Sequence, residues 1–252
     1  MRVLELCVDS VASALAAEAG GAHRIELCSA LSEGGLTPSL GLLRNVRSKL
    51  KIPVHVMIRP RTGDFVYSDD DFAIMQEDIG LAAQAGADGV VFGLLTSNGE
   101  IDIERTRALV RLSKPMQVTF HRAADLTADP VRAIEAIIQS GADRVLTSGG
   151  ELNAMLGRVG IQRLVRAARG RIHVMVGGGI RSENLAELVQ VTGVKEWHTS
   201  LRRPGARQDA PNANLLAEQL GWEQSAAPFH SEDVRRLRQI LDAADQLEHV
   251  ID

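Results

Sequence analysis

The sequence predicts a single (β/α)8 barrel over residues 1–252, and three observations carry this prediction. Eight short β-type runs alternate with amphipathic helical segments along the chain. Such alternation indicates βαβ units and therefore a parallel sheet. The length of 252 residues suits eight such units in one closed barrel. The third observation is a polar face on most of the runs.

The expected strands are residues 3–8, 24–28, 54–58, 89–92, 116–120, 144–147, 172–176 and 196–199. A doubly wound open sheet would give the same local pattern, so the faces of the strands decide between the two folds. Central strands of an open parallel sheet are apolar on both faces. Here polar residues recur at every second position, as His55 and Arg59 do on either side of Met57. A polar face turned into a lumen explains this alternation, so we favour the barrel.

The helices between the runs carry recognisable start and stop signals. Thr37-Pro38 and Asp129-Pro130 read as an N-cap followed by proline at the first helical position. Ser68 precedes three aspartates, whose charge suits the first turn of a helix. Glycines in the left-handed conformation are expected to end the helices, at Gly20, Gly86, Gly141, Gly170 and Gly193.

The C-terminal part of the chain departs from this repeat. Residues 202–228 are rich in Arg, Ala, Pro and Asn, which predicts a long irregular loop over the upper end of the barrel. Residues 231–248 then predict a closing helix, because Ser231 is a suitable N-cap and the aliphatic residues that follow form one stripe.

Composition excludes several classes of partner. The formal net charge is −4 and no basic run is interleaved with aromatic residues, so no nucleic acid partner is expected. No apolar stretch approaches the roughly 18 residues of a membrane span, so no membrane association is expected. The two cysteines are too few for a disulfide framework, which favours a cytoplasmic location.

The two cysteines lie in two copies of one tripeptide, Glu-Leu-Cys, in successive strands. Alternation places Glu5 and Cys7 on one strand, and Glu26 and Cys28 on the next, with all four side chains pointing into the lumen. Soft thiolates select Cu(I) over hard cations, so Cys7 and Cys28 are candidate metal ligands. The alternatives are two small buried side chains or a disulfide, which a reducing cytosol disfavours.

Reactive side chains gather where the strands end, which is the active end of a (β/α)8 barrel. Glu5 or Glu26 could pair with Arg59 there. A buried ion network with a purely structural role is the alternative. Candidate catalytic residues on an enzymatic reading are Glu5, Glu26, Arg59, His121, Asp125 and His198.

A second set of residues is typical of anion binding. Gly177, Gly178 and Gly179 follow a strand and lead into a helix start, where backbone N–H groups and the helix dipole favour an anion. Arg59 and Ser148 would add donors. The alternative is that the glycines merely permit a tight turn.

Several segments together resemble the CutC copper homeostasis family. They are residues 3–10, 24–28, 32–39, 58–61, 63–65, 119–123, 144–149 and 177–180. The resemblance implies a cytosolic (β/α)8 barrel that forms a homo-oligomer, a dimer or tetramer. It also implies a role in copper tolerance, with Cu(I) bound at Cys7 and Cys28.

Two functions therefore stand side by side. The first is a copper homeostasis protein that binds Cu(I) at the upper end of the barrel. The second is an enzyme that acts on a small anionic or phosphorylated metabolite, for which we expect no organic cofactor. A scaffold acting through its outer helices is a third and weaker hypothesis.

Overall fold

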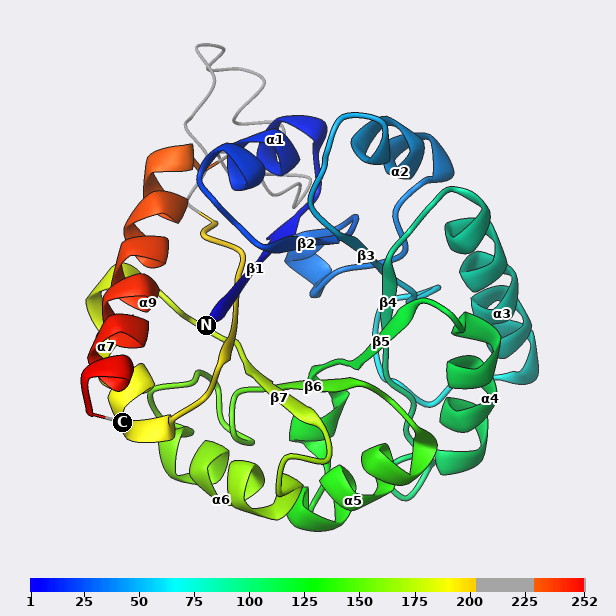
Figure 1. The fold of residues 1–252 in the computed structure, drawn as a ribbon. Helices are drawn as coiled ribbons and strands as arrows, with labels where there is room; N and C mark the ends of the chain where they lie inside the picture. Colours follow the sequence, from blue (N-terminus) through cyan, green and yellow to red (C-terminus); the bar gives the residue numbers. More distant parts are fainter. Residues whose placement is uncertain (203–228, 252) are drawn as a thin grey trace, which may run out of the picture.

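The computed structural model describes residues 1–202 and 229–251, with side chains through residue 248. Eight parallel strands form a closed barrel in chain order, with β1 paired to β8. Helices surround the strands as an outer ring (Figure 1). The predicted (β/α)8 barrel is thereby confirmed.

The strands are β1 (Val3–Val8), β2 (Arg24–Leu27), β3 (Val54–Met57), β4 (Gly89–Phe92), β5 (Gln117–Phe120), β6 (Arg144–Thr147), β7 (His173–Val176) and β8 (Glu196–Thr199). The α-helices are α1 (Val11–Ala19), α2 (Leu40–Arg47), α3 (Asp69–Gln84), α4 (Ile103–Ser113), α5 (Pro130–Ser140), α6 (Arg158–Ala168), α7 (Ser182–Thr192) and α9 (Ser231–Ile251). Two short 3-10 helices, η1 (Leu31–Glu33) and η2 (Arg122–Leu126), follow β2 and β5.

Alternation along the strands separates an apolar layer from a polar lumen. Leu4 and Leu6 of β1 and Ile25 of β2 are fully buried in the main apolar core, which the helices cover. Glu5 and Cys7 occupy the intervening positions. Glu5 pairs with Arg24, and Cys7 packs in a separate small cluster with Cys28. The period of two therefore directs aliphatic groups outward and reactive groups inward.

Two of the predicted helix boundaries are wrong for local reasons. Helix α2 is capped by Ser39, whose hydroxyl accepts from the amide of Leu42 at 3.2 Å, and not by Thr37. The Thr37 hydroxyl instead accepts from the amide of Arg59 at 2.9 Å. Gly20 is right-handed, with φ −84°, because the left-handed residue is the next one, Gly21.

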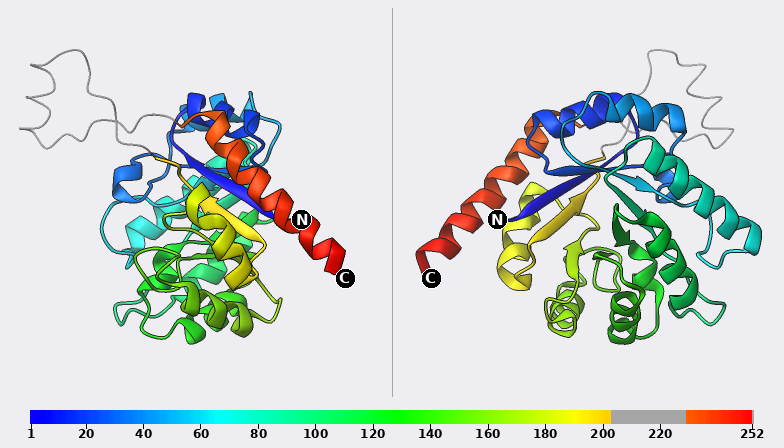
Figure 2. Two further views of the ribbon diagram at one scale, coloured as in Figure 1. Left: turned by 90° about the vertical axis from the view of Figure 1, so that its left-hand side faces the viewer. Right: turned by 45° about the vertical axis from the view of Figure 1, so that its right-hand side comes forward.

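Helix α9 closes the ring of helices between α7 and α1. Its buried stripe includes Val234, Leu237 and Leu241, and it packs against α1 and α7 (Figure 2). A Cβ at Gly20 would lie 2.4 Å from Cβ of Val234, so this approach requires glycine. The loop predicted at 202–228 lies outside the described residues beyond Arg202.

The amino end of the lumen is filled by ion pairs. Arg24, the first residue of β2, pairs with Glu5 and, at 2.7 Å, with Glu196. Arg144, the first residue of β6, also pairs with Glu196. These charges satisfy one another where a barrel usually packs aliphatic residues. Ion pairs therefore occupy the amino end of the lumen.

No helix among the described residues is both long and apolar enough to cross a membrane.

Candidate functional site

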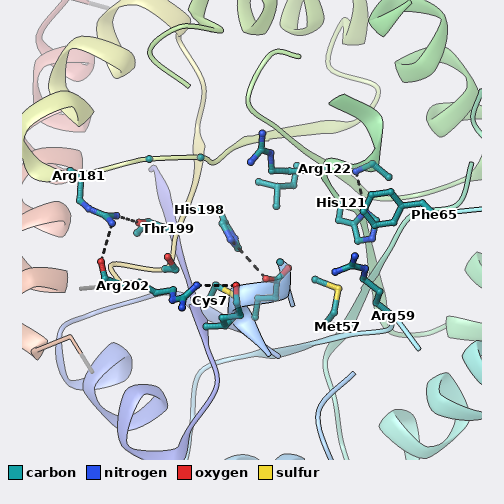
Figure 3. A pocket seen from close by; sticks show the side chains of 18 residues that line it. Cys7, Met57, Arg59, Phe65, His121, Arg122, Arg181, His198, Thr199 and Arg202 are labelled. Carbon is teal, nitrogen blue, oxygen red and sulfur yellow. Dashed lines mark hydrogen bonds and ion pairs between the residues drawn. The ribbon is translucent and has the colours of Figure 1, made fainter. Parts of the chain in front are cut away.

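A cavity of about 290 Å³ opens at the carboxyl ends of the strands. The chain segments at or just beyond the ends of β1, β2, β3, β5, β7 and β8 contribute to its wall, so residues far apart in sequence meet there (Figure 3). The polar residues of the wall include Cys7, Glu26, Arg59, His121, Arg122, Arg181, His198 and Arg202. This is the place where (β/α)8 barrels carry their active sites.

Cys7 lines the cavity, and Cys28 lies directly behind it. Their Sγ atoms are 3.6 Å apart, although the register pairs Cys7 with Glu26 and places Cys28 one layer further along. The Cys28 thiol also lies 3.5 Å from Oε2 of Glu26. A Cβ at Gly35 would be 3.2 Å from the Cys28 sulfur, so a side chain there would crowd the pair.

Both thiols hold their protons tightly. The hydrogen bond from Cys28 and then burial raise the pKa of Cys7 well above its ordinary value. Burial, with the Glu26 carboxylate beside it, raises the pKa of Cys28 to about 12. Both cysteines are therefore protonated at neutral pH, and any metal must displace these protons to bind as a thiolate complex.

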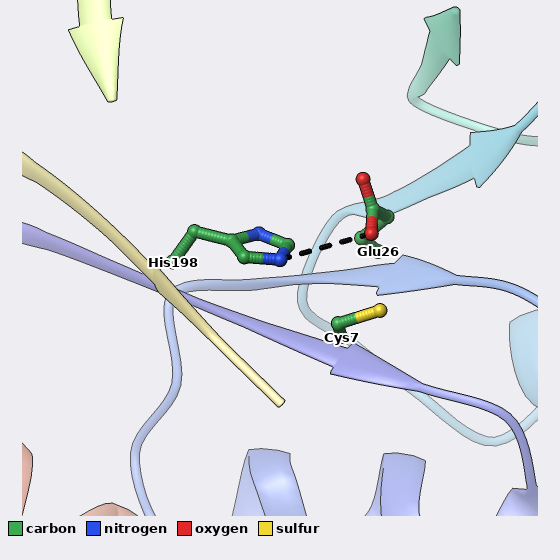
Figure 4. A group of neighbouring side chains, drawn as sticks. All are labelled: Cys7, Glu26 and His198. Carbon is green, nitrogen blue, oxygen red and sulfur yellow. Dashed lines mark ion pairs between the residues drawn. The ribbon is translucent and has the colours of Figure 1, made fainter. Parts of the chain in front are cut away.

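Three potential ligand atoms, one each from Cys7, Glu26 and His198, lie within 4.8 Å of one another (Figure 4). They come from β1, β2 and β8, which are adjacent because the barrel closes between β8 and β1. A sulfur, an imidazole and a carboxylate form a donor set suited to a transition metal or to proton transfer.

His198 is positioned by a buried carboxylate. Its Nδ1 lies 2.7 Å from Oε1 of Glu5, and its Nε2 lies 3.9 Å from Oε2 of Glu26. Burial opposes a charge on the ring, but Glu26 and Glu5 outweigh burial and raise the pKa of His198 well above its ordinary value. Burial likewise opposes ionisation of Glu5, yet Arg24 and His198 hold its pKa well below the usual range. His198 and Glu5 therefore form an ion pair between a protonated imidazole ring and an ionised carboxylate.

Glu26 is the acidic group of the wall and is incompletely bonded. Its Oε1 is buried without a hydrogen-bond partner among the described residues. Burial raises the pKa of this carboxyl above its ordinary value. A buried carboxyl with a raised pKa is a candidate for proton transfer.

Arg59 also lines the cavity, and it forms no ion pair with an acidic side chain of the described residues. Its guanidinium donates to the carbonyls of Glu33, Gly35 and Gly63 at 2.6, 3.0 and 3.0 Å. It also lies 5.0 Å from the centre of the Phe65 ring. Its Nε is buried without a partner. A guanidinium that is only 5% exposed and meets only neutral groups favours an anion beside it.

His121 adds a neutral donor next to Arg59. Its Nδ1 accepts from the amide of Ala123 at 3.2 Å, so the proton of the neutral ring is on Nε2. Burial and the nearby Arg59 lower the pKa of His121 to about 3. Nε2 is buried without a partner. A Cβ at Gly93 would lie 2.5 Å from the ring, so glycine makes room for it.

Asp125 holds the loop after β6. It accepts from the amide and hydroxyl of Ser148 at 2.9 and 3.0 Å, from the amide of Gly150 at 3.1 Å and from the Thr147 hydroxyl. Arg122 pairs with the same carboxylate at 2.9 Å. Asp125 and Ser148 are therefore engaged with each other, and neither belongs to the cavity wall.

The triple glycine contributes two of its three residues to the wall. Gly178 and Gly179 line the cavity with φ of +97° and +72°. The amide of Gly177 donates to the carbonyl of Thr147 at 3.0 Å. Arg181, which follows the turn at the start of α7, also lines the cavity.

The residues predicted from the sequence thus divide into three groups. Cys7, Glu26, Arg59, His121 and His198 share the cavity, with Gly178 and Gly179. Glu5 and Cys28 lie directly behind the wall and touch His198 and Cys7. Asp125, Ser148 and Gly177 support the loops after β5, β6 and β7.

One expected contact is wrong. Arg59 does not pair with Glu5 or Glu26, because its guanidinium turns to the η1 segment and to Gly63. The partner of Glu5 is Arg24, which sequence reasoning missed. Its position at the start of a strand, two residues before Glu26, is the signal that could have found it, since Arg24 and Glu26 share a face.

Comparisons with known proteins identify the family of the chain. The sequence matches the model of the CutC family over residues 2–203. The chain belongs to the CutC family. The copper homeostasis protein cutC homolog of Homo sapiens is 52% identical over 200 residues, which cover 79% of this chain and 73% of the human protein. A CutC family protein of Xanthomonas axonopodis pv. citri (strain 306) is 44% identical and covers 96% of this chain and 99% of its own length.

A solved CutC structure shares the fold. The putative copper homeostasis protein CutC of Streptococcus agalactiae superposes with a TM-score of 0.75 at 36% identity. The superposition covers 79% of this chain and 98% of the streptococcal chain. CutC membership thus relates this chain to a copper homeostasis family.

Proposed function

We propose that this CutC protein binds Cu(I) through Cys7 and Cys28 and serves copper homeostasis in the cytoplasm. The observation that carries the proposal is the separation of 3.6 Å between the two sulfur atoms. Two metal–sulfur bonds of about 2.3 Å can span that separation, so one ion can bond to both sulfurs. Soft sulfur ligands favour Cu(I) over the hard cations of the cell.

The surroundings of the sulfurs support the same ion. Cys7, Cys28 and Met57 share one small apolar cluster with Val91. A thioether is a soft ligand, so Met57 is placed to add a third sulfur donor. The apolar contacts would exclude water from the ion, and Cu(I) supplies no redox step in this account.

The test is an anaerobic titration with Cu(I) in the presence of a competing chelator. The native protein should bind one equivalent tightly, and Cys7→Ser and Cys28→Ser should each weaken binding by at least 100-fold. Met75→Leu is the matched control, because Met75 is an equally buried sulfur in α3. Unchanged affinity in both serine variants would refute the proposal.

A second candidate is an enzyme that acts on a small anionic metabolite. The observation that favours it is the buried Arg59, whose charge meets only carbonyl groups and the Phe65 ring on the cavity wall. Copper binding by thiols has no use for this guanidinium. Glu26 and His198 would move protons on the opposite side of the cavity. Crystals soaked in sulfate should show the anion at Arg59; sulfate bound only on the outer helices would contradict this reading.

The family resemblance leads us to propose a homo-oligomer, a dimer or tetramer. Size-exclusion chromatography with light scattering tests this, and a monomer at micromolar concentration would exclude it.

A further inference from the structure

Positive charge around the cavity exceeds negative charge. Four arginines line it, and within residues 1–202 and 229–248 only Arg122 has a carboxylate partner, Asp125 at 2.9 Å. Arg59, Arg181 and Arg202 form no ion pair with a carboxylate of the described residues. Glu26 is the acidic side chain of the described wall. Among the described residues, the cavity therefore carries three guanidinium groups that form no ion pair with a carboxylate.

These three charges occupy two ends of the cavity. Arg59 and His121 lie together on one side, and Arg181 and Arg202 lie together on the other (Figure 3). Cys7 and His198 lie between the two groups in the same view. Each end therefore offers positive charge, and the reactive cluster is in the middle.

The arginines at the other end, Arg181 and Arg202, are also held by hydrogen bonds. Arg181 donates to the Thr199 hydroxyl at 3.2 Å and to the carbonyl of Arg202 at 3.2 Å. Arg202 donates to the carbonyl of Leu31 at 2.9 Å. All these acceptors are neutral, so they fix the arginines without cancelling their charge. Arg181 is also the N-cap residue of α7, where the helix dipole adds positive potential.

The Arg59 end offers donors as well as charge. Nε of Arg59 and Nε2 of His121 are both buried and have no partner among the described residues. Two N–H donors without acceptors are costly to bury unless a ligand supplies the oxygen atoms.

We propose that the cavity binds a small metabolite with an anionic group at each end. Arg59 and His121 would take one group, and Arg181 and Arg202 would take the other. A volume of about 290 Å³ holds only a small molecule, so one ligand can reach both ends. Its central atoms would then lie beside Cys7 and His198. This inference rests on the second candidate function and specifies the substrate class of that enzyme.

The test compares compounds of matched length by calorimetry on the copper-free protein. Succinate carries two carboxylates, butyrate carries one, and 1,4-butanediol carries none. Phosphoglycolate replaces one carboxylate by phosphate. Succinate or phosphoglycolate should bind at least tenfold more tightly than butyrate, and the diol should not bind. The tighter of these two ligands identifies whether one end takes a carboxylate or a phosphate.

Variants locate the two ends. Arg59→Met and Arg181→Met should each reduce binding of the dianion at least tenfold, to the level of butyrate. Arg202→Met is a second variant at the Arg181 end, in case Arg181→Met does not fold. Arg61→Met is the control, because Arg61 pairs with Asp64 and Asp71 outside the cavity and should leave binding unchanged.

The outcomes separate this inference from the function on which it rests. Equal affinities for succinate and butyrate would overturn the two-ended site, as would a loss in Arg59→Met without a loss in Arg181→Met or Arg202→Met. Both results leave an enzyme for small anions in place. Failure of every anion to bind would overturn the inference and the second candidate function together.

Discussion

Oε1 of Glu5 lies 2.7 Å from Nδ1 of His198, and this contact directs the other ring nitrogen towards Glu26. A carboxylate behind an imidazole fixes both the orientation and the protonation of the ring, whether the ring binds a metal or transfers a proton. The contact depends on closure of the barrel, because β1 and β8 are the first and last strands.

Replacing the carboxylate should lower the pKa of His198. In Glu5→Gln the ring loses a neighbouring negative charge, so its pKa should fall towards the ordinary value of about 6.5. Loss of one partner of the buried Arg24 should also cost about 3 kcal/mol of unfolding free energy. NMR titration of the imidazole measures the first effect and urea denaturation the second. An unchanged pKa would mean that Glu5 does not control this ring; Glu100→Gln, on the surface, is the control.

His121 should make the fold sensitive to acid. Its pKa is about 3 in the folded protein and about 6.5 when unfolded, so between these values only the unfolded chain binds the proton. Stability should therefore fall as pH drops below 6.5, by about 1.4 kcal/mol per pH unit for this group. His121→Gln should reduce the slope by that amount between pH 6 and pH 4. The same slope in both proteins would show that His121 is protonated in the fold.

Gly89 makes room for His55 in the lumen. A Cβ at this position would lie 2.6 Å from the His55 ring, so Gly89→Ala should destabilise the protein by about 1–3 kcal/mol. The clash disappears when His55 is also truncated, so the double variant with His55→Ala should lose less than the sum of the single changes. Denaturation of the four proteins measures the coupling. Additive losses would mean that the strand moves to relieve the clash.

Copper binding should release protons. Both thiols are protonated at neutral pH, and a thiolate complex requires both protons to leave. The apparent affinity should therefore rise about 100-fold for each pH unit between pH 6 and pH 8. Calorimetry in buffers with different ionisation enthalpies should count two protons per ion. Binding without proton release would show that the cysteines are not the ligands.

The fold could be predicted from the sequence because the alternation along the strands agrees with the start signals of the helices. The alternation through β3 places His55 and Met57 inward and Val54 and Val56 outward, and the helix signals at Ser68 and Asp129 recur between strands. Neither signal depends on distant parts of the chain. The choice between Thr37 and Ser39 as a cap did depend on one, since Thr37 is used by Arg59.

The site was harder to predict because it depends on which side chains contact one another across the lumen. Alternation places Glu5, Glu26 and Arg59 in one lumen, but it does not say which charges meet. The nearer partner of Glu5 is Arg24 on the adjacent strand. Arg181 and Arg202 follow the ends of strands in loops without periodicity, so only the coordinates bring them to the cavity.

The most direct measurement of the copper account is anomalous X-ray scattering at the copper edge from crystals of the Cu(I)-loaded protein. The account predicts one peak within bonding distance of the sulfurs of both Cys7 and Cys28, and no peak in the double serine variant. A peak on the outer helices, or none at all with Cu(I) bound in solution, would contradict it.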